Sequence, residues 1–283
     1  MEPSRPDLPA DVLACPRCAG ALACAPGWRC TACGADFPVV DGLPWLVAEP
    51  ALLLAEWRGR LRALAAELEA QSSAYRAALT GEVARAATRS RLKLMAGACQ
   101  DHARRLRALL APLGVAPAAA ATETYRALHG ALPARQGLTS YYANLHRDWC
   151  WGDAENAAAV DAVGTALGAA APGRVLVLGA GAGRLAYDLH QRRRPALTVA
   201  ADLNPLMLAV ARRLYAGETV ELYEFPLAPR DLASQALLRE LRSPGPSAPG
   251  LHVLLADASR APFGCAAFDT VVTPWLIDIL DED

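Results

Sequence analysis

The chain has 283 residues, a length typical of about two domains, and 53% of its residues are hydrophobic, enough for a sizeable core. Its formal net charge of -1 argues against a nucleic-acid partner, for which an excess of basic residues is expected. The N-terminus lacks the apolar stretch of a secretion signal, and no apolar run approaches the roughly 18 residues needed to cross a membrane. These observations predict a cytoplasmic protein without a membrane partner.

Two C-x2-C pairs lie near the N-terminus, Cys15 with Cys18 and Cys30 with Cys33. A tight turn in each pair would point two thiolates at one ion, and two such turns complete the tetrahedral site of structural zinc. The alternative, two redox C-x-x-C motifs, usually occurs in a thioredoxin-like context that is absent here. Cys24, between the pairs, is not expected to be a ligand. We therefore predict a zinc ribbon over residues 8–48, whose metal stabilises the fold and takes no part in catalysis.

Residues 50–139 show the spacing of amphipathic helices and are predicted to form a helical region. A first apolar stripe ends at a polar stretch, residues 71–73, where we expect a break, and a second stripe ends near Pro112. His102 is expected on a helix surface, and Cys99 in the core as a small apolar residue. The stripes consist of Leu53, Trp57, Leu61, Leu64 and Leu68, and of Leu92, Met95, Cys99, Leu106 and Leu110.

The segment from Ser140 to Asn156 is denser in aromatic and polar side chains than its surroundings. Two interpretations stay open. The segment is a packed aromatic start of a helix, or it is a lid over a cofactor pocket, since such pockets combine apolar rings with a few placed polar groups. A helix over residues 155–167 is expected to lead into the next strand.

From residue 174 the sequence alternates strands and helices. The apolar run at 175–178 predicts a buried strand, and the glycines that follow it predict a sharp turn into a helix. Such alternation predicts an α/β fold, with a Rossmann-like doubly wound sheet over residues 140–283. The remaining elements are strands at 196–202, 251–257 and 268–278, a helix at 205–215 that Asn204 caps, and an insertion at 218–250.

The glycine-rich turn alone is equally consistent with an ordinary connection between a strand and a helix. A ligand is favoured because Asp202 and Asp257 end two successive strands, at the edge of a doubly wound sheet where nucleosides bind. NAD binding requires G-x-G-x-x-G and a pyrophosphate site, whereas this chain has Arg184 in place of the third glycine. Paired carboxylates suit a ribose and an adenine amine without phosphates, so S-adenosylmethionine (SAM) is favoured over NAD.

The stretch LACPRCAGAL…CTACGADFPVVDGLPWLV resembles the small bacterial zinc-ribbon proteins related to the activator subunit of several tRNA and protein methyltransferases. This resemblance covers about residues 11–47. It implies that the ribbon binds a methyltransferase, here in the same chain, and it leaves open a separate protein partner.

Residues 140–283 resemble class I SAM-dependent methyltransferases, on the glycine loop, and more narrowly the carnosine N-methyltransferase-like family. Class I methyltransferases usually have an acidic residue two positions before the first glycine of the loop. The carnosine N-methyltransferase-like family has an apolar residue at that position, and this chain has Val177. The strings GAGAGRLA, HRDWCWGDAEN, ELYEFPLAP and FDTVVTPWLIDIL also resemble the family, although Asn156 stands where the family usually has arginine.

The resemblance implies roles for individual residues. His146 and Tyr223 are weaker candidates for contacts to the methyl acceptor, whereas Asp278 would face the acceptor and hold an imidazole. The cofactor residues would be Gly179, Gly181 and Arg184 along the methionine part, Gly183 in the same loop, Asp202 on the ribose, Asp257 and Ala258 on the adenine, and Trp149 with Gly152 over the pocket.

Three functions follow from these patterns. The first is SAM-dependent N-methylation of a small imidazole-containing molecule or peptide. The second is a non-catalytic module that binds SAM or a partner and docks through the zinc ribbon. The third, methylation of tRNA or protein, rests on the ribbon alone. The sheet of class I methyltransferases usually has seven strands, and this sequence stops just after the fourth. The sheet is therefore expected to be incomplete at its C-terminal side, because the sequence is a fragment of a longer protein or because the chain is degenerate.

Overall fold

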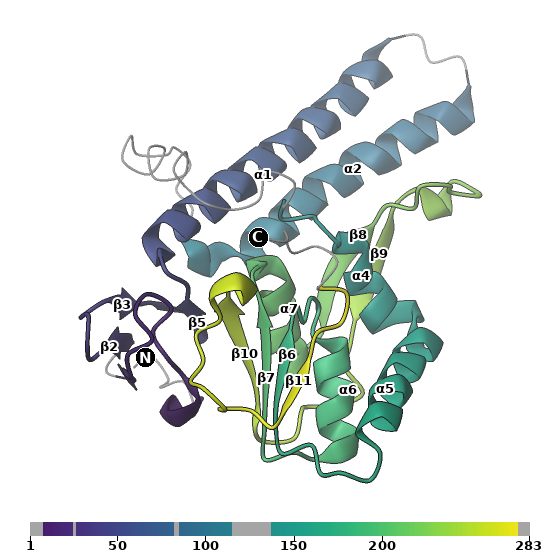
Figure 1. Cartoon of the computed structure of the whole chain (residues 1–283). Coiled ribbons are helices and arrows are strands. Elements are labelled where there is room, and N and C mark those ends of the chain that lie inside the picture. Colours follow the sequence, from purple (N-terminus) through teal and green to yellow (C-terminus); the bar gives the residue numbers. More distant parts are fainter. Residues whose placement is uncertain (1–7, 25–26, 82–84, 115–136, 277–283) are drawn as a thin grey trace. The chain divides into compact units, whose positions relative to one another are not determined.

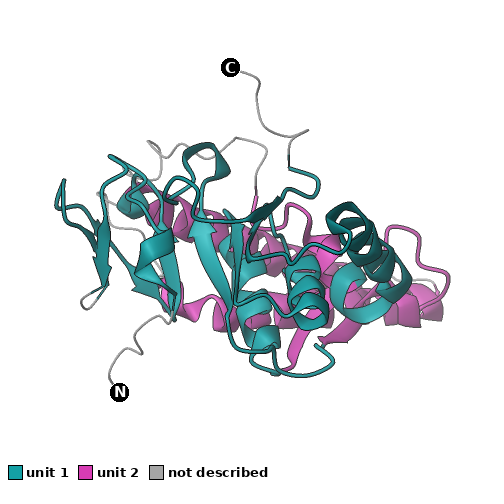
Figure 2. Cartoon of the chain, turned by 60° about the horizontal axis from the view of Figure 1, so that its bottom comes forward, with its two compact units in different colours: residues 1–51, 147–218, 242–283 teal, residues 52–146, 219–241 magenta. Residues whose placement is uncertain are grey.

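A computed structural model describes residues 8–24, 27–81, 85–114 and 137–276. The chain forms two compact units, each assembled from separate segments (Figure 2). Unit 1 comprises residues 1–51, 147–218 and 242–283, and unit 2 comprises residues 52–146 and 219–241. The predicted division into a zinc ribbon (8–48), a helical region (50–139) and a methyltransferase domain (140–283) stays a prediction. No described helix has the length and apolar character that crossing a membrane requires.

Unit 1 is built on a mostly parallel sheet of six strands, in the order β11-β6-β7-β10-β5-β4 (Figure 1). The predicted mixed α/β character is confirmed, and the fourth predicted strand, β11, pairs with the first, β6. That fourth strand is shorter than predicted, since only Thr270–Val272 pair and a turn follows. The strands are β4 (Val39–Val40), β5 (Leu43–Leu46), β6 (Arg174–Leu178), β7 (Leu197–Asp202), β10 (Leu251–Ala256) and β11 (Thr270–Val272).

Helices α6 and α7 pack on one face of this sheet. The side chain of Thr198, on β7, forms a hydrogen bond with His190 of α6, which places the alternate residues of β7 on the helical side. Helix α7 begins as predicted, because the Asn204 side chain accepts a hydrogen bond from the Leu206 amide at 3.0 Å. The helical segments of unit 1 are η1 (Ala10–Val12), a π-helix η3 (Arg147–Trp151), α5 (Asp153–Leu167), α6 (Arg184–Arg193), α7 (Pro205–Tyr215) and η5 (Ala258–Arg260).

The N-terminal ribbon covers the other face of the sheet. Its three strands β1 (Leu22–Cys24), β2 (Trp28–Cys30) and β3 (Asp36–Phe37) form a small antiparallel sheet. The buried side chains of Trp28 and Phe37 belong to the same apolar cluster as Leu176 of β6 and Leu254 of β10. The ribbon and the larger sheet therefore share one core.

The ribbon also enters the sheet through its tail. Strand β5 runs parallel to β10, with Trp45 opposite Leu255 and Leu46 opposite Ala256. The loop after β10 is held as well, because the Ala14 amide donates to the Pro262 carbonyl at 2.9 Å. This pairing joins residues more than 200 positions apart, and the sequence offers no signal for it.

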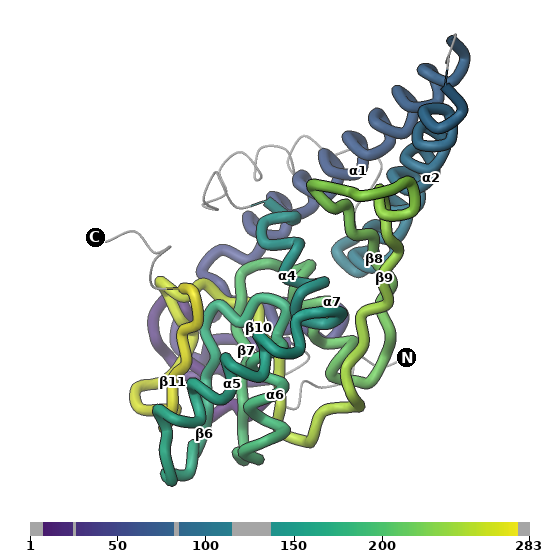
Figure 3. The backbone as a smooth tube through the Cα atoms, turned by 90° about the vertical axis from the view of Figure 1, so that its right-hand side faces the viewer, coloured from purple at the N-terminus to yellow at the C-terminus, as the bar shows by residue number. Residues whose placement is uncertain are grey.

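Unit 2 is a helical hairpin with a two-stranded antiparallel sheet (Figure 3). The predicted break at residues 71–73 is wrong. Helix α1 runs through it because Ser72 is buried, and its hydroxyl donates to the Ala96 carbonyl of α2 at 2.7 Å. The insertion at 218–250 supplies both strands. The elements are α1 (Pro50–Thr80), which starts in unit 1, α2 (Ala86–Leu109), η2 (Ala111–Leu113), α4 (Tyr142–His146), β8 (Val220–Glu224), η4 (Ala233–Gln235) and β9 (Leu237–Leu241).

The prediction that His102 lies on a helix surface is also wrong. Its side chain is 4% exposed. The rings of Tyr142, Tyr223 and Phe225 lie edge-on to it, with centroids at 5.5, 6.1 and 5.5 Å. Residues distant in sequence therefore bury this histidine. Cys99 lies in the core, as predicted.

Candidate functional site

The four predicted cysteines converge on one point in the ribbon. Their sulfur atoms all lie within 4.8 Å of one another. The Cys15 sulfur lies 3.7 Å from the Cys33 sulfur, and the Cys18 sulfur lies 3.5 Å from the Cys30 sulfur. Zinc–sulfur bonds of about 2.3 Å in a tetrahedron place sulfurs about 3.8 Å apart, so this arrangement fits such an ion. The group could hold a metal ion such as zinc, and Cys24 is not part of it.

Backbone amides support these thiolates. The Arg17 amide donates to the Cys15 sulfur, and the Cys33 amide to the Cys30 sulfur, each at 3.4 Å. Gly20 packs beside the group, where an added Cβ would lie 3.1 Å from the Cys30 sulfur and 2.8 Å from the Ala32 side chain. All ligand positions are filled by cysteine, which is typical of a structural site.

The second candidate site is the carboxyl edge of three adjacent parallel strands. Strands β6, β7 and β10 are in register, with Leu178 opposite Ala201 and Asp202 opposite Leu255. The glycine loop that follows β6, Asp202 at the end of β7 and Asp257 after β10 therefore share one edge. This is the edge at which ligands bind in open α/β sheets.

The glycine loop has the backbone conformations for which glycine is needed. Gly179, Gly181 and Gly183 have φ values of +64, +54 and +79°. The Ala180 amide donates to the Ala201 carbonyl at 3.0 Å, and the Gly181 amide donates to Asp202 Oδ2 at 2.8 Å. The loop is thus tied to the end of β7 by two successive amides.

Asp202 organises this edge. Its second oxygen, Oδ1, accepts the Asn204 amide at 2.8 Å. Burial raises the pKa of this carboxyl, and the amides of Asn204 and Gly181 act in the opposite direction. The Leu203 amide acts in the same direction as these two. A carboxylate has about four lone-pair sites, so the three amides leave capacity for a further donor such as a ribose hydroxyl.

Asp257 and Ala258 lie at the same edge, and both are partly exposed. Asp257 caps the short helix η5, because its Oδ1 accepts the Ser259 amide at 2.9 Å and the Ser259 hydroxyl at 2.6 Å. The contact with Ser259 uses one of its two carboxylate oxygens. The role of both residues at the adenine stays a prediction.

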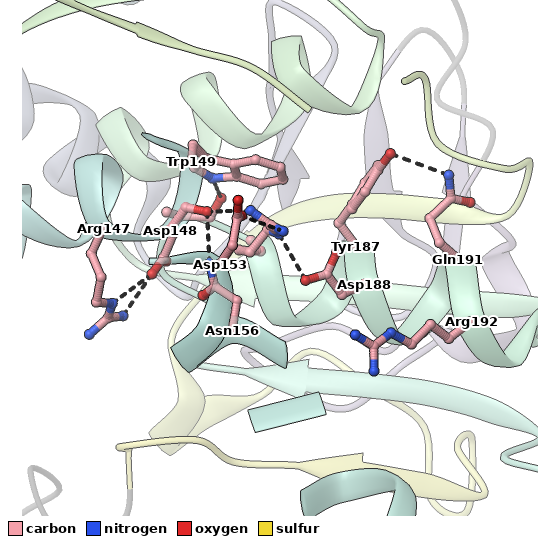
Figure 4. Close-up of polar contacts among 12 residues, drawn as sticks. Arg147, Asp148, Trp149, Asp153, Asn156, Tyr187, Asp188, Gln191 and Arg192 are labelled. Atoms are coloured by element: carbon pink, nitrogen blue, oxygen red, sulfur yellow. Dashed lines mark hydrogen bonds and ion pairs between the residues drawn. The ribbon is translucent and has the colours of Figure 1, made fainter. Parts of the chain in front are cut away.

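Arg184 is held by polar contacts with Asp148, Asp153 and Asp188, whose positions Figure 4 shows. Its guanidinium donates to Asp188 Oδ2 at 2.8 Å, to the Asp148 carbonyl at 2.5 Å and to Asp153 Oδ1 at 3.2 Å. It also lies 5.2 Å from the centre of the Trp149 ring. The predicted contact of Arg184 with the methionine part of SAM stays a prediction, and the structure shows that this side chain joins η3 and α5 to α6.

Trp149, in the π-helical turn, lies against the loop, and Gly152 directly follows that turn. Trp149 is buried and donates its ring N–H to the Ala182 carbonyl at 2.9 Å. Gly152 packs so closely that an added Cβ would lie 2.5 Å from the Arg147 carbonyl. Single π-turns are frequent at functional sites, which agrees with the choice of this segment from its composition.

Three predicted candidates are not among the described residues of unit 1. His146 and Tyr223 belong to unit 2, and Asp278 lies outside the described residues. Among the surface hollows of the described residues, one of about 440 Å³ lies beside Cys33 in the ribbon and one of about 390 Å³ lies between α5 and α6, beside Arg192. Neither is lined by the glycine loop, so the loop's assignment rests on backbone geometry and polar contacts.

Sequence reasoning missed one residue of this site, Tyr215. The tyrosine ends α7, and its hydroxyl donates to the Gly183 carbonyl at 2.7 Å. The end of α7 has no local feature that marks such a contact, because the acceptor lies more than 30 residues earlier.

Comparisons with known proteins found no matching family model and no matching curated protein sequence.

Proposed function

We propose that this chain binds SAM at the carboxyl edge of β6, β7 and β10 and belongs to the Rossmann-like methyltransferases. The observation that carries the proposal is the hydrogen bond from the Gly181 amide to Asp202. It joins a glycine loop, which lets a ligand approach the backbone, to a carboxylate with remaining acceptor capacity. Asp257, directly after the neighbouring strand β10, adds a second carboxylate to the same edge.

The residues at this edge fit SAM better than they fit NAD. The G-x-G-x-x-G pattern of dinucleotide sites places a third glycine where this chain has Arg184. That side chain is held by Asp188, Asp153 and the Trp149 ring. A cofactor with a ribose and an adenine but no pyrophosphate matches the two acids.

The reaction proposed is N-methylation of a small imidazole-containing molecule or peptide. SAM supplies a methyl group that is already activated by its positive sulfonium. The protein has to align the acceptor nitrogen and leave its lone pair free, so orientation accounts for much of the acceleration. Asp278 is the predicted residue for holding the second ring nitrogen, as an acceptor of its N–H.

Calorimetric titration tests the binding step. SAM is expected to bind the wild-type chain, NAD is not, and Asp202→Ala is expected to weaken SAM binding at least about tenfold, a loss of about 1.4 kcal/mol. Asp231→Ala is the matched control, because it removes an acid in unit 2 that bonds only to its own turn in the described contacts. Circular dichroism of each variant checks folding. Tight NAD binding, or equal SAM affinity of wild type and Asp202→Ala, would contradict the proposal.

The non-catalytic alternative is tested by turnover. Wild-type chain with SAM and an imidazole-containing dipeptide should release S-adenosylhomocysteine if the chain is an enzyme. SAM binding without release for imidazole, peptide and tRNA acceptors would favour a binding module. Docking through the ribbon is disfavoured because its large apolar residues Trp28 and Phe37 pack in the core of unit 1.

A further inference from the structure

Two successive carbonyls of the glycine loop accept hydrogen bonds from buried aromatic side chains. The Ala182 carbonyl accepts the Trp149 ring N–H at 2.9 Å, and the Gly183 carbonyl accepts the Tyr215 hydroxyl at 2.7 Å. Both contacts are buried. Both donors are therefore directed at the backbone of the loop, and polar side-chain atoms at such depth are costly unless paired.

The donors belong to a continuous column of rings inside unit 1. The Trp149 ring meets the Tyr187 ring edge-on at 5.6 Å, and Tyr187 stacks on Tyr215 at 5.9 Å. Figure 4 shows the Trp149 ring of η3 to one side of Tyr187, which lies on α6. The column links η3, α6 and α7, which are three separate segments, to one short loop.

The contact with Tyr215 requires glycine in the loop. A Cβ added at Gly183 would lie 2.3 Å from the Tyr215 hydroxyl oxygen and 2.9 Å from the Ala211 Cβ. The positive φ of Gly183 strains any other residue as well. The glycine is therefore explained by a close contact on the inner side of the loop, in addition to any ligand on the outer side.

Fixing the two carbonyls also fixes the amides that follow them. In a planar trans peptide the N–H points opposite to the C=O. The Gly183 amide donates to the Ala180 carbonyl at 2.9 Å, inside the turn. The Gly183 carbonyl accepts both the Tyr187 amide of α6, at 3.0 Å, and the Tyr215 hydroxyl. The Arg184 amide is therefore directed away from the ring column, at the N-terminus of α6, where free amides favour polar or anionic groups.

We propose that Trp149 and Tyr215 are positioning residues that hold the glycine loop in the conformation that receives the ligand. The expected gain in SAM affinity rests on the proposed function. The restraint of the loop by Trp149 and Tyr215 does not depend on it. The rival explanation is that both residues only fill the core.

Tyr215→Phe tests the inference, and Tyr187→Phe is its matched control. The two rings stack on each other, and each hydroxyl donates to a backbone carbonyl, but the Tyr187 hydroxyl donates to Gly245, outside the loop, at 2.8 Å. Each substitution removes one hydroxyl and leaves the ring. Trp149→Phe removes the other donor to the loop.

Hydrogen–deuterium exchange of residues 179–185 in the unliganded protein measures the restraint. We expect Tyr215→Phe and Trp149→Phe to speed exchange in this segment about three- to tenfold, the effect of one buried hydrogen bond, and Tyr187→Phe to leave it unchanged. SAM affinity by calorimetry is expected to fall by a similar factor in the first two variants only. Thermal unfolding reports the general loss of stability in all three.

The outcomes separate the two proposals. If exchange of the loop is the same in Tyr215→Phe, Tyr187→Phe and wild type, or if SAM affinity falls equally in both tyrosine variants, the positioning role is wrong. If exchange responds as expected but the wild-type chain binds no SAM, the restraint is established and the proposed function is wrong.

Discussion

Two buried histidines among the described residues of unit 2 predict that this unit is sensitive to acid. His102 and His146 are 4% and 1% exposed. His102 Nδ1 and both ring nitrogens of His146 have no regular hydrogen bond to a described residue. Burial lowers the pKa of His102 from 6.5 to about 4, and burial also lowers the pKa of His146. The folded unit therefore holds both rings in the neutral form.

Charged neighbours do not reverse this effect. Asp101 raises the pKa of His102, whereas His146 and Arg105 lower it further. At His146, Glu224 and the Tyr223 backbone act to raise the pKa and Arg239 to lower it, and burial still dominates.

The sign and size follow from linkage. A histidine whose pKa is lower in the folded state contributes stability above its unfolded pKa, and this stability is lost as the pH falls from 6.5 toward 4. With 6.5 unfolded and about 4 folded, His102 alone should cost the fold about 2 kcal/mol at pH 5 and about 3 kcal/mol at pH 4, relative to pH 7. His146 adds in the same direction.

Urea unfolding from pH 7.5 to 4.5, followed by circular dichroism, measures this slope. Unit 2 contains the two longest helices, so its unfolding dominates the helical signal. His102→Leu removes one titrating group and should flatten the slope by about 2 kcal/mol between pH 7 and 5, whatever it does to stability at pH 7. His252→Leu, on β10 in unit 1, is the control. Equal slopes for wild type and His102→Leu would refute the reasoning.

Two further predictions concern the ribbon and the glycines. Chelation of the metal, or Cys15→Ser, should expose Trp28, shift its fluorescence to the red and lower the thermal midpoint of unit 1, because metal binding and folding of such sites are coupled. Cys24→Ser should retain the metal, and an unchanged midpoint without metal would contradict the shared core. Gly183→Ala should destabilise by about 2 kcal/mol or more, since its Cβ would meet Tyr215 at positive φ. Gly97→Ala, in α2 with open space, should instead stabilise by about 0.5–1 kcal/mol, as calorimetry can show.

Local patterns in the sequence were sufficient for the parts of this protein that local forces decide. The spacing of the C-x2-C pairs indicated the four-cysteine group, since each pair forms within one turn. Asn204 followed by Pro205 indicated the start of α7, because a cap acts on the amide two residues away. Short apolar runs indicated β6, β7 and β10, in which most side chains are buried, on both faces of the sheet.

Contacts between distant residues decided the rest. Ser72 suggested a helix break, yet a carbonyl of α2 satisfies its hydroxyl and α1 continues. His102 suggested a surface, yet rings from residues 142, 223 and 225 bury it. The pairing of Trp45 with Leu255, and the contact of Tyr215 with Gly183, likewise join residues that no local pattern connects. Burial and hydrogen bonding depend on what the chain brings near a residue, and for these residues only the tertiary structure supplies that neighbour.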